Sequence, residues 1–246
     1  RCAAPTVKRV TQELGGKSPY IILDDDAYHK NVAGAVASMM GNSGQTCSAG
    51  SRILVPASRM DEAAQIARQT AEQVTVGDPN TDVAMGPVSS RVQFNKIQGL
   101  IRAGIEEGAT LVCGGLERPE GLPTGYYVKP TVFAHVTNSM TIAKEEIFGP
   151  VACIIAYRDL DEAVAIANDT EYGLAGYVAG TDLEQARKIA RKIRAGWVSI
   201  NDGFDFNCPF GGYKKSGNGR EWGEFGFHDF LEIKGILGYA PEAAPS

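Results

Sequence analysis

Two spacings of apolar residues divide the chain into predicted helices and strands. Between positions 27 and 40, Val32, Val36 and Met39 recur at helical spacing, with acidic residues before them and Gly41 after them, so this segment is predicted to be a helix. Short apolar runs bounded by turn residues predict buried strands. In the first half of the chain we predict helices over residues 27–40, 58–73 and 90–107 and strands over residues 52–55, 109–113 and 127–136.

The second half of the chain alternates regularly between strands and helices. A last apolar-alternating stretch, Phe230–Tyr239, follows a Gly-rich loop and is predicted to be a strand that pairs outside this domain. Short connections between successive strands and helices favour a parallel sheet with right-handed crossovers, so the predicted fold class is α/β. The predicted strands are residues 151–157, 174–179 and 197–201, and the predicted helices are residues 160–168 and 182–194.

Local signals also predict helix starts and buried faces. Capping-box spacing predicts that two helices begin near Ser58, with Asp61, and near Thr181, with Glu184. Apolar residues at helical spacing are expected to be buried. They are Ile97, Ile101 and Ile105 in one helix and Leu183, Ala186, Ala190 and Ile193 in another.

Composition narrows the class of protein. The chain has 246 residues, a formal net charge of −5 and 43% hydrophobic residues, which supplies enough apolar mass for a core and excludes a disordered chain. The acidic balance argues against a nucleic-acid-binding protein, and the longest apolar run, Val151–Tyr157, is too short to span a membrane. Because the chain starts at Arg1 with no initiator Met, we expect a piece of a longer protein.

The cysteines and histidines indicate neither disulfides nor a metal site. No two of the five cysteines form a Cys-x-x-Cys pair, and the three histidines are scattered, so no zinc-binding spacing arises. A disulfide framework is not expected at this size and cysteine density. We therefore expect a reducing, cytoplasmic compartment and no metal.

The loop predicted around Cys47 is the most informative candidate site. Small residues flank the thiol on both sides, in the sequence Asn-Ser-Gly-Gln-Thr-Cys-Ser-Ala-Gly, so that a substrate and backbone amides can approach the sulfur. A free thiol ionises near pH ~8.5 and needs its environment to become a nucleophile. The alternative is that Cys47 is a small buried apolar residue, and the local sequence favours neither interpretation.

Two acidic segments are further candidates. Alternation from Val10 to Leu14 predicts a strand ending at a Gly-Gly turn, which places Glu13 at a strand end, where ligand sites of parallel α/β sheets gather. Glu13 could act there as a general base, or it could be an ordinary solvated residue. Glu145 and Glu146 precede an Ile-Phe-Gly-Pro sequence. A Glu at this position could bind a sugar diol, or the two acids could be charges at a helix end.

A Gly-rich segment, Pro209–Glu221, invites interpretation as a phosphate-binding loop. The required Gly-Lys-Ser/Thr does not occur at the right spacing, and Trp222 stands where a dinucleotide-binding fingerprint would place its third glycine. We therefore reject both phosphate-binding motifs for this segment.

Together these segments resemble the aldehyde dehydrogenase superfamily. Glu-Leu-Gly-Gly-Lys, Gly-Gln-Thr-Cys, Glu-Glu-Ile-Phe-Gly-Pro and Pro-Phe-Gly-Gly-Tyr-Lys-x-Ser-Gly occur in the family's order, and the resemblance covers residues 8–239. It implies the parallel-sheet catalytic domain of that family, without most of the N-terminal dinucleotide-binding domain. The implied boundaries are residues 1–16 for the end of the cofactor-binding domain, 17–228 for the catalytic domain and 229–246 for an oligomerisation strand and tail.

The resemblance also implies roles for six residues. Cys47 attacks the aldehyde carbonyl and carries a thiohemiacetal and then a thioester, and Glu13 activates the water that releases a carboxylic acid. The other implied roles are a second acid of the water relay for Glu221, binding of the nicotinamide ribose for Glu146, packing beside the nicotinamide for Phe148, and lining of the aldehyde tunnel for Phe210. NAD or NADP, an aldehyde substrate and a homodimer or homotetramer are implied, and the isolated chain is expected to be inactive as a dehydrogenase.

Two other functions are compatible with parts of the sequence. One is a thiol hydrolase that pairs Cys47 with His29, His135 or His228. The other is a binding protein on a dehydrogenase fold that has lost its activity. The presence of Cys47, Glu13 and Glu146 together argues against the second, because an abandoned site need not keep all three.

Overall fold

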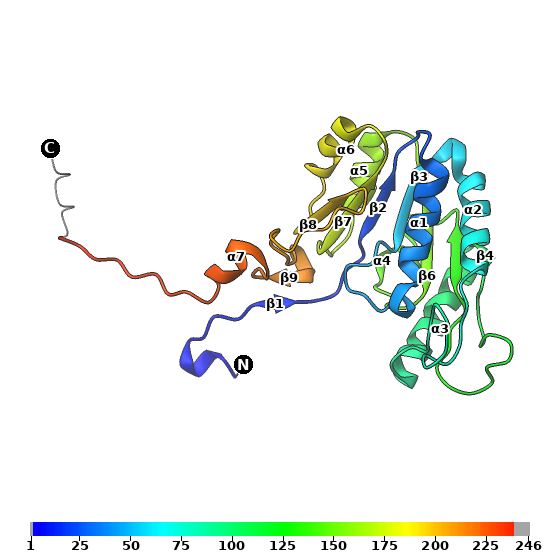
Figure 1. Cartoon of the computed structure of the whole chain (residues 1–246), viewed down its shortest axis with the longest axis horizontal. Helices are drawn as coiled ribbons and strands as arrows, with labels where there is room; N and C mark the ends of the chain where they lie inside the picture. The colour runs from blue at the N-terminus through cyan, green and yellow to red at the C-terminus, as the bar shows by residue number, and fades with distance from the viewer. Residues whose placement is uncertain (1, 239–246) are drawn as a thin grey trace.

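The computed structural model describes residues 2–238 and is built around one seven-stranded sheet (Figure 1). The strand order is β4-β5-β6-β3-β2-β7-β8, and each neighbouring pair is parallel except β4 and β5. This arrangement confirms the predicted α/β class with a mainly parallel sheet. The strands are β2 (Pro19–Ile22), β3 (Arg52–Pro56), β4 (Thr110–Cys113), β5 (Thr131–Ala134), β6 (Val151–Tyr157), β7 (Ala175–Ala179) and β8 (Trp197–Ile200).

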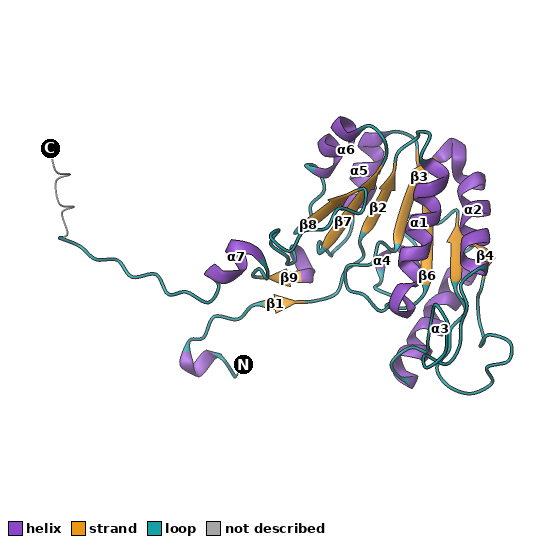
Figure 2. Cartoon of the chain, viewed as in Figure 1, coloured by secondary structure: helices purple, strands orange, loops and turns teal. Residues whose placement is uncertain are grey.

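Helices cover both faces of the sheet (Figure 2). Along β2, Ile22 is buried in the apolar layer against one pair of helices, whereas Ile21 is buried in the layer on the opposite face, as the two-residue period of a strand requires. The pair on the first face is α1 (Tyr28–Met40) and α2 (Met60–Glu72), and the second face is covered by α3 (Arg91–Glu106), α4 (Thr141–Lys144), α5 (Leu160–Asn168) and α6 (Leu183–Ala190).

The predicted elements of the second half agree with the structure in order and nearly in length. β6 and α5 have the predicted bounds, whereas α6 ends at Ala190, four residues early. The predicted strand over residues 127–136 is shortened to β5, because Pro130 has no N–H to donate to a neighbouring strand. The central strand β2 was not predicted, since its short apolar run begins at a proline, Pro19.

Both predicted capping boxes are wrong. A 3₁₀ turn, Ala57–Arg59, leads directly into α2, and Ser58 makes no capping hydrogen bond there. At α6 the cap is Asp182, whose carboxylate accepts the backbone N–H of Gln185 at 3.0 Å, and not Thr181. An aspartate is a stronger cap than a threonine, and it stands one position closer to the helix.

The predicted buried faces are confirmed for most of their residues, including Ile193 at the end of its stripe, and are wrong for Ile105 and Leu183. Ile97 and Ile101 are fully buried in α3, but Ile105 is 40% exposed at its end. In α6 Leu183 is 46% exposed, and Ile189 is buried although it was not in the predicted stripe. Helical spacing alone therefore does not decide burial in the terminal turns of a helix.

A second, two-stranded sheet lies to one side of the main sheet, together with α7 (Gly223–His228) (Figure 1). β1 (Gln12–Glu13) pairs antiparallel with β9 (Gly217–Asn218). The strand predicted from Val10 to Leu14 therefore forms only in its middle, and it does not belong to the parallel sheet. The predicted final strand does not form over residues 230–238, where Ile233 is 99% exposed, and Tyr239 lies outside the described residues.

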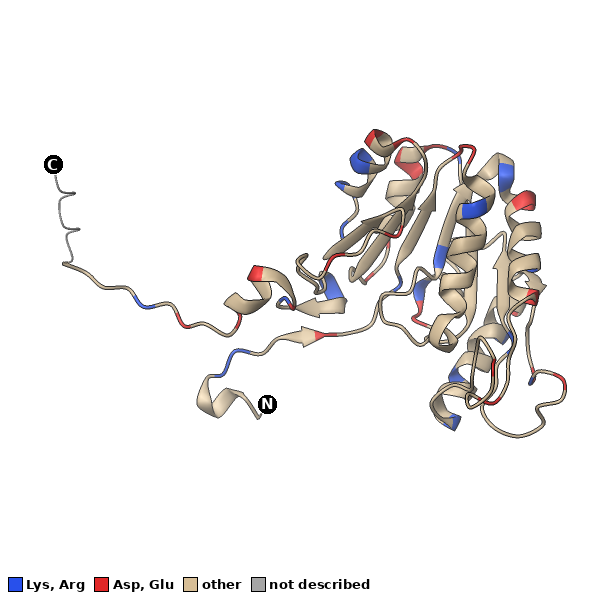
Figure 3. Cartoon of the chain, in the orientation of Figure 1, with Lys and Arg blue, Asp and Glu red and all other residues tan. Residues whose placement is uncertain are grey.

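Charged residues of both signs are distributed along the helices and loops (Figure 3). Of the helices that the structure describes, not one has the length and apolar character needed to cross a lipid bilayer.

Arg52 is a buried charged residue at the first position of β3. Its side chain has no solvent exposure. Its guanidinium donates to the carbonyl oxygens of Lys17, Ile166 and Ala167 and to the side-chain oxygen of Asn138, at 2.8–3.0 Å. Arg52 therefore joins the segment before β2 to the carbonyl end of α5, and it satisfies acceptors that would otherwise be buried without a partner.

We predict that Arg52→Met lowers the free energy of unfolding by about 3 kcal/mol, because it leaves several buried carbonyls unpaired. Urea denaturation with linear extrapolation measures this change. The matched control is Arg158→Met, which removes an exposed arginine paired with Glu162 and should leave the midpoint nearly unchanged. Equal midpoints for the two variants would contradict the structural role of Arg52.

Candidate active site

The loop that carries Cys47 lies between α1 and β3 and is held at several points. Ser43 adopts a left-handed backbone conformation (φ 56°), and its hydroxyl donates to the carbonyl of Gly86 at 2.9 Å. The side-chain oxygen of Gln45 accepts the backbone N–H of Ser89 at 2.8 Å. Cys47 is half-buried in this fixed loop, so its thiol has a defined position.

The structure brings Glu13 to the thiol. The Cys47 thiol and the Glu13 carboxylate lie close enough to shift each other's pKa, and only the thiol can donate a proton to an ionised carboxylate. Burial and the negative charge of Glu13 raise the pKa of the Cys47 thiol to about 11, although the backbone N–H groups of Ser48 and Cys47 act in the opposite direction. At neutral pH the thiol therefore keeps its proton, with a carboxylate beside it.

The pKa of Glu13 is also raised. Partial burial of its carboxyl is the main cause, and repulsion from the carboxylates of Glu221 and Glu146 adds to it, while the neighbouring Cys47 thiol acts against it. The residue as a whole is exposed, so the desolvation is local to the side that meets the thiol. Three predicted acids and the predicted thiol thus lie in one neighbourhood, and Glu13 is placed to accept a proton.

The Gly-Gly turn after Glu13 connects the thiol loop to Glu146. The backbone N–H of Gly16 donates to the Glu146 carboxylate at 3.0 Å. A Cβ at Gly16 would stand 2.6 Å from the carbonyl oxygen of Cys47, closer than side-chain carbons approach backbone oxygens. Only glycine allows the two segments to lie this close.

The loop before β6 holds Phe148 beside the thiol loop. Phe148 is half-buried with a left-handed backbone (φ 55°), and its carbonyl accepts from the Gln93 side chain at 2.8 Å. Gly44 of the thiol loop (φ 69°) packs directly on the backbone of Gly149, which leaves no room for a Cβ. The segment with Glu146 and Phe148 is therefore fixed against the segment with Cys47.

Phe210 joins the site through Glu221. The backbone groups of Phe210 and Glu221 exchange two hydrogen bonds of 2.7 Å, and the ring of Phe210 stacks on Trp222 with 4.9 Å between centroids. Phe210, which the resemblance places in the aldehyde tunnel, therefore holds the backbone of Glu221, the acid whose charge acts on Glu13.

These segments gather at the amino ends of the parallel strands. Glu13 precedes β2, Cys47 precedes β3 and Glu146 precedes β6. Ligand sites of open α/β sheets are usual at the carboxyl ends, so the reasoning that placed Glu13 at the end of a strand of the parallel sheet is wrong. Glu13 reaches the thiol from the separate β1–β9 ladder instead.

Sequence reasoning gave no role to Arg52 or to Tyr177. The Tyr177 hydroxyl donates to the carbonyl of Ser48 at 2.9 Å and so supports the residue next to the thiol. The sequence did contain a signal for both residues, because each places a polar group within an otherwise apolar stretch that forms a buried strand. Arg52 starts β3 and Tyr177 lies in β7, and such groups occur in buried strands only where they have partners.

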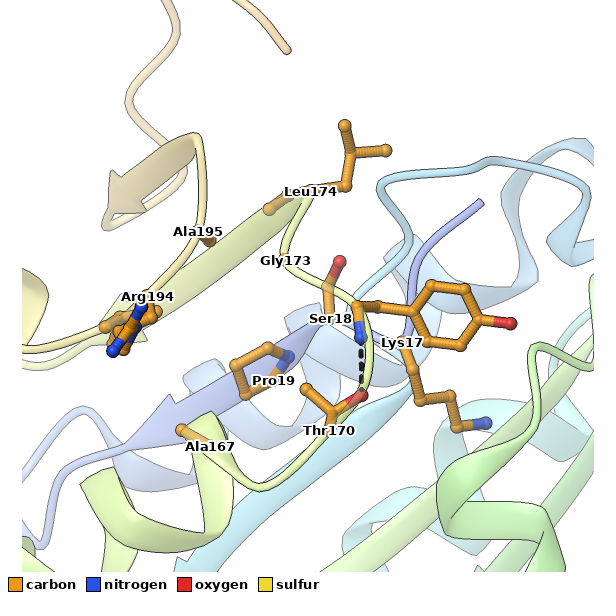
Figure 4. Close-up of a pocket in the computed structure, with 12 residues that line it drawn as sticks. Lys17, Ser18, Pro19, Ala167, Thr170, Gly173, Leu174, Arg194 and Ala195 are labelled. Atoms are coloured by element: carbon orange, nitrogen blue, oxygen red, sulfur yellow. Dashed lines mark hydrogen bonds between the residues drawn. The ribbon is translucent and has the colours of Figure 1, made fainter. Parts of the chain in front are cut away.

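A small cavity lies between the starts of β2 and β7, and Lys17, Ser18 and Gly173 are among the residues that line it (Figure 4). Its volume is about 10 Å³, room for roughly one water molecule and too little for an aldehyde. Burial lowers the pKa of Lys17, whose Nζ has no hydrogen-bond partner among the described residues. Within residues 2–238, no three His, Cys, Asp or Glu side chains converge to hold a metal ion.

The chain is similar to known proteins over almost its whole length. The sequence profile of the aldehyde dehydrogenase family matches residues 1–236. A 3-succinoylsemialdehyde-pyridine dehydrogenase from a Pseudomonas species is 54% identical over 239 residues, which are 96% of this chain and 50% of that protein. The chain spans about half the length of the curated relatives it matches.

Solved structures show the same similarity. The structure of a variant of aldehyde dehydrogenase C from Pseudomonas syringae, in complex with NAD+ and octanal, matches this chain with a TM-score of 0.94 at 53% sequence identity. The match covers 98% of this chain and 50% of the Pseudomonas syringae chain. An aldehyde dehydrogenase of Mycobacterium tuberculosis in complex with NAD+ has a TM-score of 0.90 at 47% sequence identity, and the match covers 97% of this chain and 50% of that one. The chain belongs to the aldehyde dehydrogenase family.

Proposed function

We propose that this chain is the catalytic portion of an NAD(P)-dependent aldehyde dehydrogenase that oxidises an aldehyde to a carboxylic acid. The observation that carries the proposal is the proximity of the Cys47 thiol and the Glu13 carboxylate in a chain of this family. We assign residues 1–16 to the end of the cofactor-binding domain, residues 17–228 to the catalytic domain and residues 229–246 to the oligomerisation segment.

In the first step Cys47 is the nucleophile and Glu13 is its base. The thiol proton passes to the neighbouring carboxylate as the sulfur attacks the aldehyde carbon, which gives the alkoxide of the thiohemiacetal. The raised pKa of Glu13 makes it a stronger base for this transfer. The backbone N–H groups that point at the sulfur stabilise the thiolate while it forms.

Glu146 and Phe148 are proposed to hold the nicotinamide end of NAD or NADP. One Glu146 oxygen accepts the Gly16 N–H, and the half-buried carboxylate keeps acceptor capacity for ribose hydroxyls, so the residue fits this group. When bound, the nicotinamide supplies an acceptor for the hydride of the thiohemiacetal. The relatives determined with NAD+ support a nicotinamide cofactor.

Glu13 first releases the thiol proton to solvent and then acts a second time, on water. The acyl group remains on the Cys47 sulfur as a thioester, and Glu13 takes a proton from the water that attacks it. The carboxylic acid leaves and the sulfur regains its proton. Glu221, whose charge already acts on Glu13, is proposed to stabilise the protonated state of that carboxyl and to pass its proton onward.

The alternative of a thiol hydrolase finds less support. The Cys47 thiol lies beside the carboxylate of Glu13, whereas His135 lies 3.3 Å from Asp61 and His228 lies 3.8 Å from Glu224. These two imidazoles are therefore engaged with other acids, and a carboxylate occupies the place that a hydrolase would give to a histidine.

We further propose a homodimer or homotetramer in a cytoplasmic compartment. Phe230, Ile233 and Leu237 are 85%, 99% and 98% exposed, and pairing of this stretch with another copy would bury their side chains. All five cysteines are free thiols, which is consistent with a reducing compartment.

We predict that the rate at which iodoacetamide alkylates Cys47 increases with pH, with the midpoint of the increase near pH 11. Burial and Glu13 raise the pKa of the thiol to about 11, and only the thiolate reacts. Mass spectrometry of the Cys47 peptide measures the rate at each pH. Glu13→Gln removes the negative charge and should move the midpoint downward. An unchanged midpoint in this variant would contradict the contact between the two side chains.

We predict that Glu13→Gln in the complete enzyme slows thioester hydrolysis by about 10²-fold or more, because the attacking water loses its base. The first step is slowed less, because without the negative charge of Glu13 the Cys47 thiol ionises more readily. Stopped-flow absorbance should then show a burst of reduced cofactor close to one per active site, followed by slow turnover. Cys47→Ser is the control and should give neither burst nor turnover. A normal steady-state rate in Glu13→Gln would remove Glu13 from this role.

We predict that residues 1–246 alone do not oxidise aldehydes with NAD or NADP, because the chain spans about half the length of its relatives and supplies only the nicotinamide end of the proposed cofactor site. Absorbance of reduced cofactor measures the activity, and the relative from Pseudomonas syringae serves as a positive control. Turnover by the isolated chain would overturn this expectation.

A further inference from the structure

A surface groove lies where the start of α3 meets the loop that follows β4 (Figure 1). Its volume is about 570 Å³, within the range of about 300–1,000 Å³ that is usual for small-molecule sites. The groove shares no residue with the thiol loop or with the segment before β6. We call it the α3 groove, and its lining includes Arg91, Phe94, Arg118, Gly125 and Tyr126.

Arg118 is held in a fixed position at the α3 groove. Its Nε donates to the carbonyl of Gly125 at 2.8 Å, and its guanidinium carbon lies 4.9 Å from the centroid of the half-buried Phe94 ring. The two terminal nitrogens of the guanidinium have no hydrogen-bond acceptor within residues 2–238. Because the plane of the group is already fixed, a ligand that accepts from these nitrogens restricts little further motion.

Arg91 brings a second positive charge to the α3 groove. It is the first residue of α3, its side chain is exposed, and in the described part of the chain that side chain makes no hydrogen bond or ion pair. The hydroxyl of Ser90 caps the helix by accepting the N–H of Gln93 at 3.2 Å. The helix therefore begins beside the groove, and the partial positive charge of its amino end adds to that of the two arginines.

Acidic residues do not neutralise these arginines. Glu117 and Glu120 lie close to Arg118 in the sequence, but neither lines the α3 groove, and among the described residues neither forms an ion pair with Arg118 or Arg91. Arg59, by contrast, is paired with two carboxylates. Two unpaired guanidinium groups at one groove favour an anion, and they favour a dianion over a monoanion because both charges are then matched.

Tyr126 supplies the uncharged part of the α3 groove. Its ring is half-buried, and its backbone carbonyl accepts the N–H of Val88 at 3.0 Å, which fixes the ring relative to the segment before α3. A guanidinium presents parallel N–H donors that match two oxygens of a phosphate group. The ring and the volume of the groove leave room for an organic group attached to that phosphate.

We propose that the α3 groove binds a phosphate dianion, either the free ion or the monoester of a small molecule, through the guanidinium groups of Arg91 and Arg118. The site is separate from Cys47, Glu13 and Glu146, so the inference does not depend on the proposed dehydrogenase function. It assigns to this chain a second ligand besides an aldehyde and a nicotinamide cofactor.

Equilibrium dialysis of the complete enzyme tests this binding without turnover. The measurement uses low salt and about pH 8, where a phosphomonoester is a dianion, and saturating NAD+ to fill the cofactor site. We expect saturable binding of about one phosphate group per chain. Tighter binding of phenyl phosphate than of inorganic phosphate identifies a monoester, and tighter or equal binding of inorganic phosphate identifies the free ion. No saturable binding of either, or equally tight binding of the monoanion benzoate, would overturn the proposal.

Variants of the two arginines test the assignment of the site. Arg91→Gln and Arg118→Gln should each weaken binding of the tighter probe at least about tenfold. Arg102→Gln is the matched control, because it removes the same charge from an exposed position of α3 outside the α3 groove, and it should change the affinity less than about twofold. Equal effects in all three variants would show a response to net charge alone and would contradict the assignment.

Chemical protection of the unmodified enzyme tests the same two residues without a substitution that could disturb folding. Butanedione modifies accessible guanidinium groups, and mass spectrometry of the digested protein gives the rate at each arginine. Bound phenyl phosphate should slow modification of Arg91 and Arg118 at least about fivefold and leave the rate at Arg102 unchanged. Equal rates with and without phenyl phosphate at Arg91 and Arg118 would refute the site.

Discussion

The close approach of the Cys47 thiol and the Glu13 carboxylate is the contact on which the rest of the site depends. It keeps the sulfur protonated and gives that proton a defined destination. It also requires that two segments from different parts of the fold approach within contact distance. The Gly16 turn permits this approach, because Gly16 lies against the carbonyl of Cys47 and donates its N–H to Glu146. One turn thus sets the distances among thiol, base and proposed ribose ligand.

The main sheet serves the site as a support. The segments before β2, β3 and β6 converge because the three strands are neighbours in the sheet, and their amino ends therefore meet at one edge. Arg52 stabilises this edge by hydrogen bonds to the carbonyl oxygens of Lys17 and of Ala167 at the end of α5. Lys17 directly follows the Gly-Gly turn. The carboxylates come from outside the strands, and Glu13 in particular comes from the small β1–β9 ladder. Its position therefore depends on β9, which follows the whole catalytic sheet in the sequence.

The sequence predicts the parts of this structure that are local in the chain. Alternating strands and helices from Val151 to Ile200 needed only short-range periodicity, and they are correct within a few residues. β2 was missed because a four-residue strand that begins with proline has no distinctive period. The ladder that carries Glu13 could not be predicted, since its partner, Gly217–Asn218, lies about two hundred residues away. The sequence motifs identified the thiol and the acids as candidate site residues. Their contacts could not be predicted, because they arise from tertiary packing.

Trapping the covalent intermediate tests the central claim most directly. The complete enzyme with Glu13→Gln should be incubated with aldehyde and NAD+, quenched and digested, and the peptide that contains Cys47 weighed by mass spectrometry. The predicted result is a mass increase equal to one acyl group on Cys47, accumulating because the water that would release it lacks its base. An unmodified Cys47, or an acyl group found on another cysteine, would contradict the account.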